Sequence, residues 1–301
     1  MAEHDGCLVL EFGGEAVCLE GRATRALLPA LLPLLDGTRT LEEIVLVLGE
    51  PARAAIEAAL VLLVENGVLG DGPPLARDVP APFAAAARGG AAAWGGSAAA
   101  VRDRLARSAF AVAGAGATAA EVARLLRLSG AGAVASIGWD GPLDDVDVAV
   151  AAPAPGERPQ LSDWNERLLE TQTPWLQLLA FDGAFAAIGP LFVPRETCCY
   201  ECYRRRRASN IDYPDEFWAL ERAPDRAPEA PPAVAAAAGL AVGFVLRWLL
   251  FSDPFVAGVL FALDLGHEPR LTPHVVYRVP RCPACSEVVR LAPPRPWAEA
   301  S

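Results

Sequence analysis

The stretches Cys199-Tyr-Glu-Cys202 and Cys282-Pro-Ala-Cys285 form two widely separated CxxC pairs in the last third of the chain. Each pair presents two thiolates to one cation, and two pairs complete the tetrahedral four-thiolate shell that is typical of structural zinc. Such a shell has no open position for a substrate, so we expect the metal to stabilise a fold and to take no part in chemistry. Two disulfides or four free thiols are the alternative.

The other three cysteines carry weaker signals. Cys198 lies beside the first pair and is either a spare thiol or the true ligand in place of its neighbour. Cys7 and Cys18 lie in apolar stretches, and we expect both to be buried as small hydrophobic residues. Seven cysteines, an odd number that includes a metal pattern, fit a reducing cytoplasm.

Composition and charge bound the class of protein. The 301 residues suffice for one large domain or two smaller ones, and 53% of them are hydrophobic, enough for a sizeable core. The formal net charge of −11 argues against nucleic acid or an anionic membrane as a partner. The acidic start Met1–Asp5 lacks the basic region of a signal peptide.

One apolar run is just long enough to cross a bilayer. It covers Ala233–Phe251 and carries the single charge of Arg247. The run is rich in alanine and glycine and precedes the second CxxC pair. We therefore expect a buried helix and not a membrane span.

The sequence contains no lysine, and its 26 basic residues besides histidine are all arginine. This excludes any mechanism that requires a lysine amine, whether as a Schiff base or as a contact to nucleotide phosphates.

Residues 1–72 are predicted to form a first domain that begins with a β-hairpin. The strand-like runs Cys7–Phe12 and Glu15–Glu20 flank Gly13-Gly14. Three helices follow. The first, within Ala26–Leu35, is expected to be broken or kinked by Pro29 and Pro33.

The second helix opens on the capping box Thr40-Leu-Glu-Glu43 and reaches Leu48. The third is expected to run from Pro51, a residue well suited to the first helical position, to Asn66. A hairpin followed by three helices is a winged-helix-like arrangement.

Residues 73–98 are rich in proline and alanine and are interpreted as a linker, and residues 99–301 as an α/β domain. Buried strands alternate there with helices, which implies a doubly wound, mostly parallel sheet with helices on both faces. We expect residues 211–232 to form an exposed loop. The expected strands are 108–113, 131–137, 147–152, 175–181, 184–192, 259–265 and 274–279, and the expected helices are 118–128 and 163–171.

A glycine-rich turn follows the first of these strands. In Gly114-Ala-Gly116-Ala-Thr-Ala119 the spacing is that of a dinucleotide-binding turn at a helix N-terminus. No acidic residue clearly ends the next strand near Ile137 to hold a ribose, and Asp140 is the nearby candidate. A purely structural turn is the favoured interpretation.

Other chemistry-bearing residues give little signal. The run Arg204–Arg207 could contact a phosphate or an acidic partner, although a solvated helix face packed with acidic neighbours is favoured. His4, His267 and His274 show no spacing to one another or to a nucleophile, and no GxSxG, HExxH or Walker A sequence is present.

Three stretches carry a family resemblance. Ile188–Tyr203 and Val279–Cys285, which contain the two CxxC pairs, resemble the ThiF/ubiquitin-activating superfamily, whose doubly wound domain has a glycine-rich turn and a CxxC…CxxC zinc site. Leu32–Glu43 resembles the PqqD-like RiPP recognition element, a small winged-helix domain that binds the leader of a ribosomal peptide substrate. Joined in this order, the two units resemble the leader-binding proteins of thiazole/oxazole-modified microcin (TOMM) pathways.

The departures from an active enzyme decide the predicted function. The resemblance implies that adenylating relatives use a lysine and an arginine on the ATP phosphates and an aspartate for magnesium. This chain has no lysine, and Pro153-Ala-Pro-Gly156 follows the strand that ends at Ala152. Such charged groups supply much of the stabilisation in phosphoryl and adenylyl transfer. We therefore predict no ATP cofactor, no catalysis, and a vestigial nucleotide loop at Gly114 and Gly116.

The resemblance then implies a substrate-recognition subunit that captures a precursor peptide and delivers it to a separate YcaO-type cyclodehydratase. An extended leader would add a strand to the hairpin edge and place side chains against the third helix. Homodimers are common among ThiF-like relatives. The candidate contacts, for which core packing is the alternative, are Val17, Cys18, Leu19, Arg53, Ile56, Glu57 and Leu60.

Two enzyme functions are the alternatives. One is a ThiF-like, ATP-dependent peptide adenylyltransferase that also binds a leader, with arginine in place of the lysine. The other is a sulfur-carrier or ubiquitin-like activating protein, which would leave the first domain unexplained.

Overall fold

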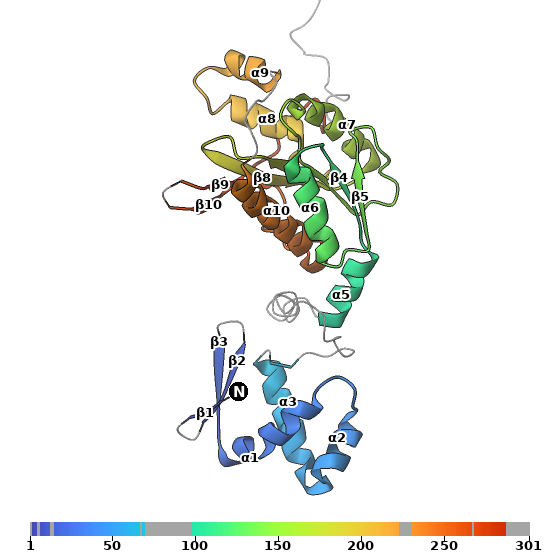
Figure 1. Ribbon diagram of the computed structural model, residues 1–301, viewed down its shortest axis with the longest axis vertical. Coiled ribbons are helices and arrows are strands. Elements are labelled where there is room, and N and C mark those ends of the chain that lie inside the picture. Colours follow the sequence, from blue (N-terminus) through green and yellow to red (C-terminus); the bar gives the residue numbers. More distant parts are fainter. Residues whose placement is uncertain are drawn as a thin grey trace, which may run out of the picture. The chain divides into compact units, whose positions relative to one another are not determined.

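The computed structural model describes residues 2–4, 7–12, 15–66, 68–69, 98–222, 230–266 and 268–286 (Figure 1). The chain divides into two compact units, Met1–Arg104 and Leu105–Ser301. The predicted linker 73–98 lies outside the described residues except for Ala98, where helix α5 (Ala98–Arg107) begins.

The first unit begins with a three-stranded antiparallel sheet in the order β1-β2-β3. Its strands are β1 (Ala2–His4), β2 (Cys7–Phe12) and β3 (Glu15–Glu20). The predicted hairpin is confirmed, and β1 is an additional strand that its short polar sequence does not signal. Because β3 pairs only with β2 among the described strands, it lies at an edge of the sheet.

The register of β2 and β3 determines which side chains enter the core. Leu8 pairs with Leu19 and Leu10 with Val17, and the four lie on one face of the sheet. That face packs against helix residues that include the fully buried Leu31.

Three helices follow within the described residues 22–65, each preceded or followed by a short turn. They are α1 (Arg22–Leu31), continued by a 3-10 turn over Leu32–Leu34; α2 (Leu41–Leu48); and α3 (Arg53–Glu65), preceded by a 3-10 turn over Glu50–Ala52. The predicted break of the first helix is confirmed, since α1 ends at Leu31 and Pro33 lies in the 3-10 turn that follows. One detail is wrong: Pro51 belongs to the 3-10 turn before α3, where its missing N–H is equally harmless.

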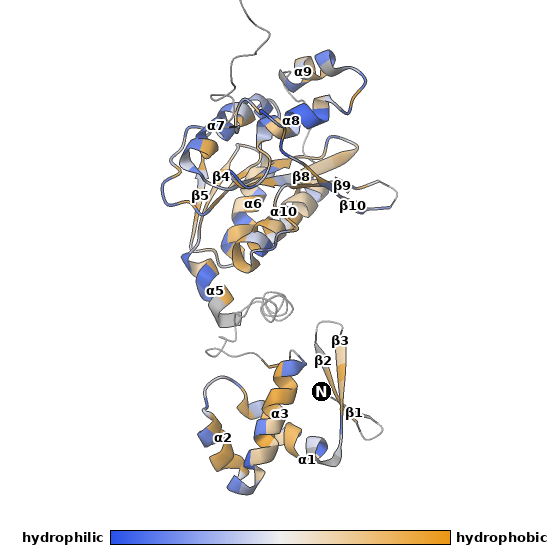
Figure 2. Ribbon diagram, turned by 180° about the vertical axis from the view of Figure 1, so that it is seen from behind, coloured by the Kyte–Doolittle hydropathy of each residue, from blue (hydrophilic) through white to orange (hydrophobic). Residues whose placement is uncertain are grey.

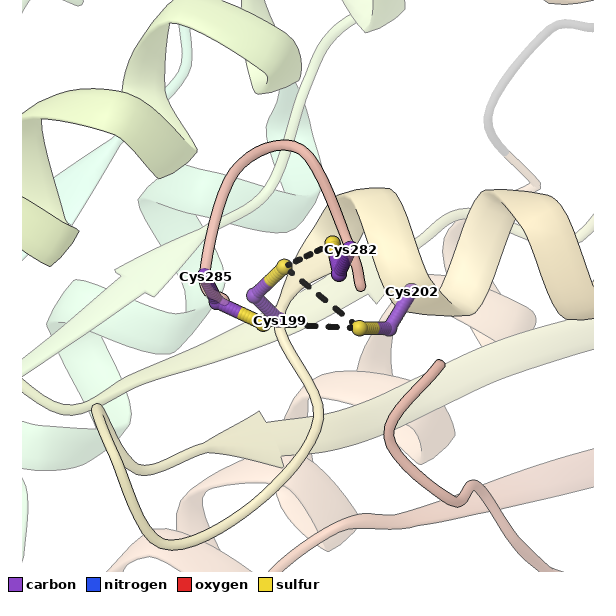
Figure 3. A group of neighbouring side chains, drawn as sticks. All are labelled: Cys199, Cys202, Cys282 and Cys285. Carbon is purple, nitrogen blue, oxygen red and sulfur yellow. Dashed lines mark hydrogen bonds between the residues drawn. The ribbon is translucent and has the colours of Figure 1, made fainter. Parts of the chain in front are cut away.

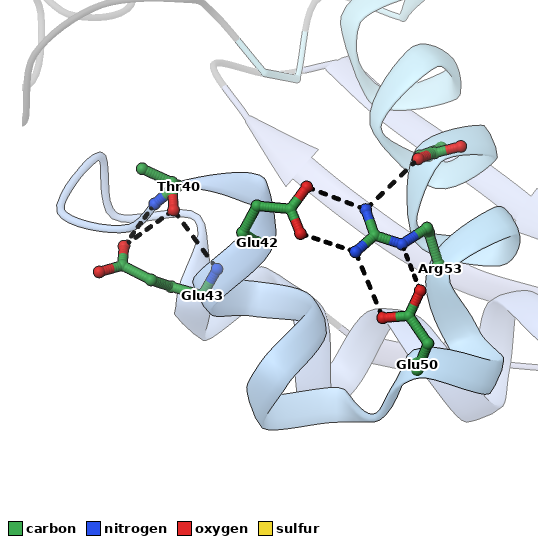
Figure 4. A network of polar contacts seen from close by, with 6 residues as sticks. Thr40, Glu42, Glu43, Glu50 and Arg53 are labelled. Atoms are coloured by element: carbon green, nitrogen blue, oxygen red, sulfur yellow. Dashed lines mark hydrogen bonds and ion pairs between the residues drawn. The ribbon is translucent and has the colours of Figure 1, made fainter.

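The capping box at the start of α2 is confirmed (Figure 4). The Glu43 amide donates to Thr40 Oγ1 at 3.3 Å, and the Thr40 amide donates to Glu43 Oε2 at 2.8 Å. The bonds that the Thr40 amide and hydroxyl donate to the carboxylate lower the pKa of Glu43. The loop into α3 is held by Arg53, which donates to both Glu42 and Glu50.

The second unit is built on a seven-stranded sheet in the order β10-β9-β8-β7-β6-β4-β5. Strands β5, β4, β6 and β7 run parallel, whereas β7, β8, β9 and β10 pair antiparallel. The sheet is therefore mixed, which corrects the prediction of a mostly parallel one. The strands are β4 (Ala109–Ala113), β5 (Ala133–Ile137), β6 (Val148–Ala151), β7 (Trp175–Leu179), β8 (Phe185–Phe192), β9 (Val259–Asp264) and β10 (Arg270–Val275).

Helices cover both faces of this sheet (Figure 1). On one face α6 (Ala117–Leu128) packs on β4 and β5, and α10 (Pro231–Phe251) packs on α6, β7 and β8. On the other face α7 (Leu161–Thr171) and α8 (Tyr200–Ala208) share a buried cluster with the strands. Their small partners on the strands, which let α7 and α8 approach closely, are Ala111, Ala113, Ala149 and Ala151.

Two segments differ from the sequence prediction. The predicted loop 211–232 contains helix α9 (Pro214–Arg222), in which Phe217 and Glu221 are buried. The last strand is β10, and it lies before the predicted 274–279 because its partner β9 fixes the pairing of Val275 with Val259. The proline and charged residues of the first segment favoured a loop over a helix. The apolar residues after β10 favoured a strand that is placed too late in the sequence.

Helix α10 is long enough and apolar enough to cross a membrane by length and composition. In the structure 61% of its most apolar window is buried, and its apolar surface packs against α6 and the sheet. Figure 2 shows α6 and α10 as largely hydrophobic ribbons. The apolar composition of α10 thus serves the core of the second unit.

Replacing the cap residue tests how α2 is held. Thr40→Ala removes the acceptor for the Glu43 amide, and we expect α2 to lose about 1 kcal/mol of local stability. Hydrogen–deuterium exchange of the full-length protein should then be about fivefold faster over residues 41–48. Thr40→Ser keeps the oxygen and should exchange like wild type; equal protection in Thr40→Ala would contradict the role of the cap.

Candidate metal centre

Four cysteine sulfurs converge at one point of the second unit (Figure 3). The Sγ atoms of Cys199, Cys202, Cys282 and Cys285 all lie within 4.8 Å of one another. Individual Sγ–Sγ distances are 3.8 Å for Cys199–Cys202, 3.7 Å for Cys199–Cys282 and 3.5 Å for Cys202–Cys285. A tetrahedral zinc ion with Zn–S bonds of about 2.3 Å requires sulfurs about 3.8 Å apart. The four thiols therefore have the spacing of a four-thiolate zinc site.

The first CxxC pair is positioned by the start of α8. Cys199 is extended and precedes the helix, and Cys202 lies in its first turn, so both sulfurs face the same side. Asn165 of α7 fixes this start, because its Oδ1 accepts from the Tyr200 amide at 2.9 Å.

The second CxxC pair lies on the segment that follows β10. There Arg281 adopts a left-handed conformation, with φ of 57°, that turns the chain into Cys282. The Val279 amide donates to Cys202 Sγ at 3.3 Å, which joins the two pairs directly. Arg278 ties the same segments together by donating to the carbonyls of Arg195 at 2.8 Å and Cys285 at 3.0 Å.

The electrostatics of the cluster favour negative charge on one sulfur, that of Cys202. Hydrogen bonds from Cys199 and Cys285 hold the pKa of Cys202 well below its ordinary value. The same contact raises the pKa of Cys199. A bound divalent cation would displace the remaining protons, since thiolates are the species that bind metal.

The structure distinguishes the alternatives left open for these cysteines. Cys199, not Cys198, is in the four-sulfur group, and all four members are free thiols and not disulfides. Cys198 is 2% exposed, and burial raises its pKa to about 12, so it remains a neutral thiol. The cluster fits zinc, and sequence spacing alone identified its four members.

Cys7 and Cys18 are paired as a disulfide, with Cα atoms 5.9 Å apart, so the prediction of two free, buried thiols is wrong. Cys7 is buried, but Cys18 is exposed. Because Val17 and Leu19 face the core, the residue between them faces the opposite side of the sheet. A disulfide is uncommon in a reducing cytoplasm, so the cellular compartment stays a prediction.

The residues predicted to bind a leader lie on β3 and α3 at different depths. Leu19 and Ile56 are 6% and 0% exposed and pack in the core of the first unit. Val17 and Leu60 are partly buried against the same core. Contact of these four residues with a leader stays a prediction. In the structure their side chains pack in or against the core of the first unit.

The remaining predicted contacts, Cys18, Arg53 and Glu57, are more accessible. The Arg53 side chain is 31% exposed and is held by Glu42 and Glu50, with Glu57 at 4.0 Å (Figure 4). The hydrogen bonds that Arg53 donates to Glu42 and Glu50 raise its pKa. Its charge is therefore already matched within the first unit.

The glycine-rich turn between β4 and α6 is filled by the chain itself. Gly114 has φ of 124°, and a Cβ there would come within 1.9 Å of the Ala152 carbonyl oxygen, so close packing on the end of β6 requires this glycine. The Glu157 carboxylate accepts from the Ala115 amide at 3.1 Å and from the Ala154 amide at 2.8 Å. Sequence reasoning missed Glu157, because nothing in its neighbourhood indicates that it folds back on the turn.

Comparison with known proteins gives the fold. No family model and no curated protein matches the sequence. The structure of the heterocyclase TruD matches with a TM-score of 0.69 and 23% identity, over 95% of this chain and 42% of TruD. A heterocyclase in complex with substrate and cofactor matches with a TM-score of 0.71 and 22% identity, over 94% of this chain and 38% of that one.

The E. coli protein MccB matches over nearly its whole length. The TM-score is 0.58 at 15% identity, over 94% of this chain and 96% of MccB. The chain thus shares an α/β fold with a mixed seven-stranded sheet with MccB and with part of TruD. At these identities the likeness establishes the fold alone, and the chain spans less than half the length of the heterocyclases.

Removing one thiolate tests the metal site. Cys202→Ser and Cys282→Ser should each lower zinc from about one ion per chain to a small fraction and destabilise the second unit, because metal binding is coupled to folding. Inductively coupled plasma mass spectrometry and thermal unfolding would measure both. Cys198→Ser is the matched control and should keep its zinc. A stable Cys282→Ser protein with stoichiometric zinc would contradict the four-cysteine site.

Proposed function

We propose that this chain is a non-catalytic scaffold that binds the leader of a ribosomal precursor peptide and delivers it for azole or azoline formation. The observation that carries the proposal is the fold that the chain shares, over most of its length, with proteins of peptide modification. Its fold matches 96% of MccB, which has been crystallised with MccA, and also matches the TruD heterocyclase. The likeness spans 42% of TruD, so we propose that a YcaO-type cyclodehydratase, outside these 301 residues, supplies the chemistry.

The open edge of β3 offers a physical means of binding an extended leader. A peptide that adds a strand to a sheet edge gains affinity from main-chain hydrogen bonds, whatever its side chains. Phe12 pairs with Glu15 next to the two-residue loop, so these two form a hydrogen-bonded pair, and Cys18, three positions further along, belongs to a pair of the other kind. The N–H of Cys18 accordingly points away from β2, toward the leader.

Specificity would come from the helix. Residues Ala54, Ala58 and Val61, at helical spacing on α3, are exposed and form an apolar stripe, with the Val61 side chain 57% exposed. We propose that apolar leader side chains pack on this stripe, with Glu57 beside it. The buried Leu19 and Ile56 support the two contact surfaces from below.

The absence of catalysis is proposed from the second unit. The sequence has no lysine for nucleotide phosphates. At the glycine-rich turn Glu157 accepts from the Ala115 amide, which in a phosphate-binding turn would face the nucleotide. A fixed carboxylate at this place repels phosphate oxygens. A ThiF-like peptide adenylyltransferase remains the second candidate, because MccB has also been crystallised with ATP, and ATP–pyrophosphate exchange by the purified chain would favour it.

A single amide tests the proposed edge. Cys18→Pro removes the outward N–H at an edge position that tolerates proline, and it should weaken binding of a fluorescently labelled leader at least about tenfold. The leader is taken from the precursor encoded beside this gene, and binding to full-length protein is followed by fluorescence anisotropy.

Cys18→Ala is the matched control, because it loses the same thiol and disulfide but keeps the amide. It should bind the leader within about twofold of wild type. Equal affinity of the proline and alanine variants would contradict strand addition at β3, and no binding to wild type would contradict the scaffold function.

A further inference from the structure

A pocket in the second unit lies between the chain after β6, the ends of β7 and β8, and α8. Two guanidinium groups, of Arg158 and Arg207, contribute to its wall. Much of the remaining wall is apolar or aromatic and includes Leu179, Phe181, Phe185 and Tyr203. None of these residues belongs to the cysteine cluster or to the proposed leader-binding surface.

Three arginines beside this pocket share one carboxylate. Glu221 of α9 has a side chain only 3% exposed, and it pairs with Arg158, with Arg207 at 3.2 Å and with Arg204 at 3.5 Å. One buried carboxylate can match one of these positive charges. The other two need a further source of negative charge.

Neighbouring acidic residues supply only part of the negative charge that these arginines need. Glu201 lies 3.6 Å from Arg204 but also pairs with Arg205 at 2.6 Å, so four arginines share two glutamates. Two positive charges are left unmatched among these residues, in a chain whose net charge is −11. Figure 2 shows α8 as a strongly hydrophilic helix.

Arg158 also carries an unused donor. Its Nε atom is buried and has no hydrogen-bond partner among the described residues, whereas the Nε atom of Arg204 faces Glu221 at 3.5 Å. Aromatic rings hold the guanidinium groups in place: Arg207 lies over Phe217 at 5.3 Å, and Arg204 over Trp218 at 4.8 Å. Arg158 therefore has a donor that Glu221 does not use, and ring contacts fix the orientation of Arg204 and Arg207.

One acid in the pocket wall is already engaged. Asp182 Oδ1 accepts from the amides of Ala184 at 2.9 Å and Phe185 at 3.0 Å, which fixes the turn between β7 and β8. It does not pair with Arg158 or Arg207. The wall thus presents two arginines with spare positive charge beside apolar surface.

We propose that this pocket binds a small oxyanion, carboxylate or phosphoryl, with Arg158 and Arg207 as its ligands. Guanidinium groups bind both kinds of oxyanion through paired N–H donors. Phe181 and Phe185 would contact an apolar group attached to the anion. None of the residues 114–119 of the glycine-rich turn lines this pocket, so the proposed site is separate from that turn.

The test measures anion binding to the full-length, zinc-loaded protein by isothermal titration calorimetry. The probes are sodium pyrophosphate and N-acetylphenylalanine, each compared with sodium chloride at the same ionic strength. At least one probe should bind to wild type, and Arg158→Gln should weaken it at least tenfold. Pyrophosphate alone would assign a phosphoryl ligand, and N-acetylphenylalanine alone a carboxylate.

The matched control is Arg205→Gln, on the same helix as Arg207 but outside the pocket wall, which should bind within twofold of wild type. Arg158→Gln leaves Glu221 paired with Arg204 and Arg207, so we expect it to fold and keep its zinc. If it does not, Arg207→Gln serves in its place. No binding of either probe to wild type, or equal loss in Arg205→Gln and the pocket variant, would overturn the proposal.

Discussion

The convergence of four cysteine sulfurs constrains the second unit more than any other contact. Cys199 and Cys202 belong to the start of α8, whereas Cys282 and Cys285 follow β10, so the two pairs meet only when the antiparallel half of the sheet has formed. The cluster is closed, and a metal there stabilises the fold without touching a substrate. The wide spacing of the two pairs therefore indicates that two distant segments meet in the fold, and it also identifies the four ligands.

The chain after β6 is the second constraint. Glu157 accepts from the Ala115 amide of the glycine-rich turn and from the Ala154 amide of its own segment, and the next residue, Arg158, pairs with Glu221 on α9. The segment that follows β6 thus makes its charged contacts within the second unit. This is one ground for the proposal that the first unit, with its open β3 edge, recognises the peptide and that the second unit supports it.

Local patterns carried much of the fold. The capping box of α2 depends on two residues three positions apart, and the cysteine pairs depend on two short motifs, so both could be predicted from the sequence. Features that depend on distant partners could not be predicted in this way. The exposure of Cys18 depends on which face of β3 meets the core, and α9 buries Glu221 only because arginines from other segments surround it. The antiparallel direction of β8 was predictable, because the short turn at Asp182-Gly183 joins it to β7. The places of β9 and β10 in the sheet depend on distant partners, which alternating apolar runs do not encode.

The central claim is that this chain promotes a reaction that it does not itself catalyse. The most direct measurement is the rate of azoline formation by the YcaO-type partner, followed by mass spectrometry as loss of water from the precursor. The account predicts that adding this chain raises the rate for a precursor with its leader, and has little effect on the same core peptide without the leader. An equal rate with and without this chain, for the precursor with its leader, would contradict it.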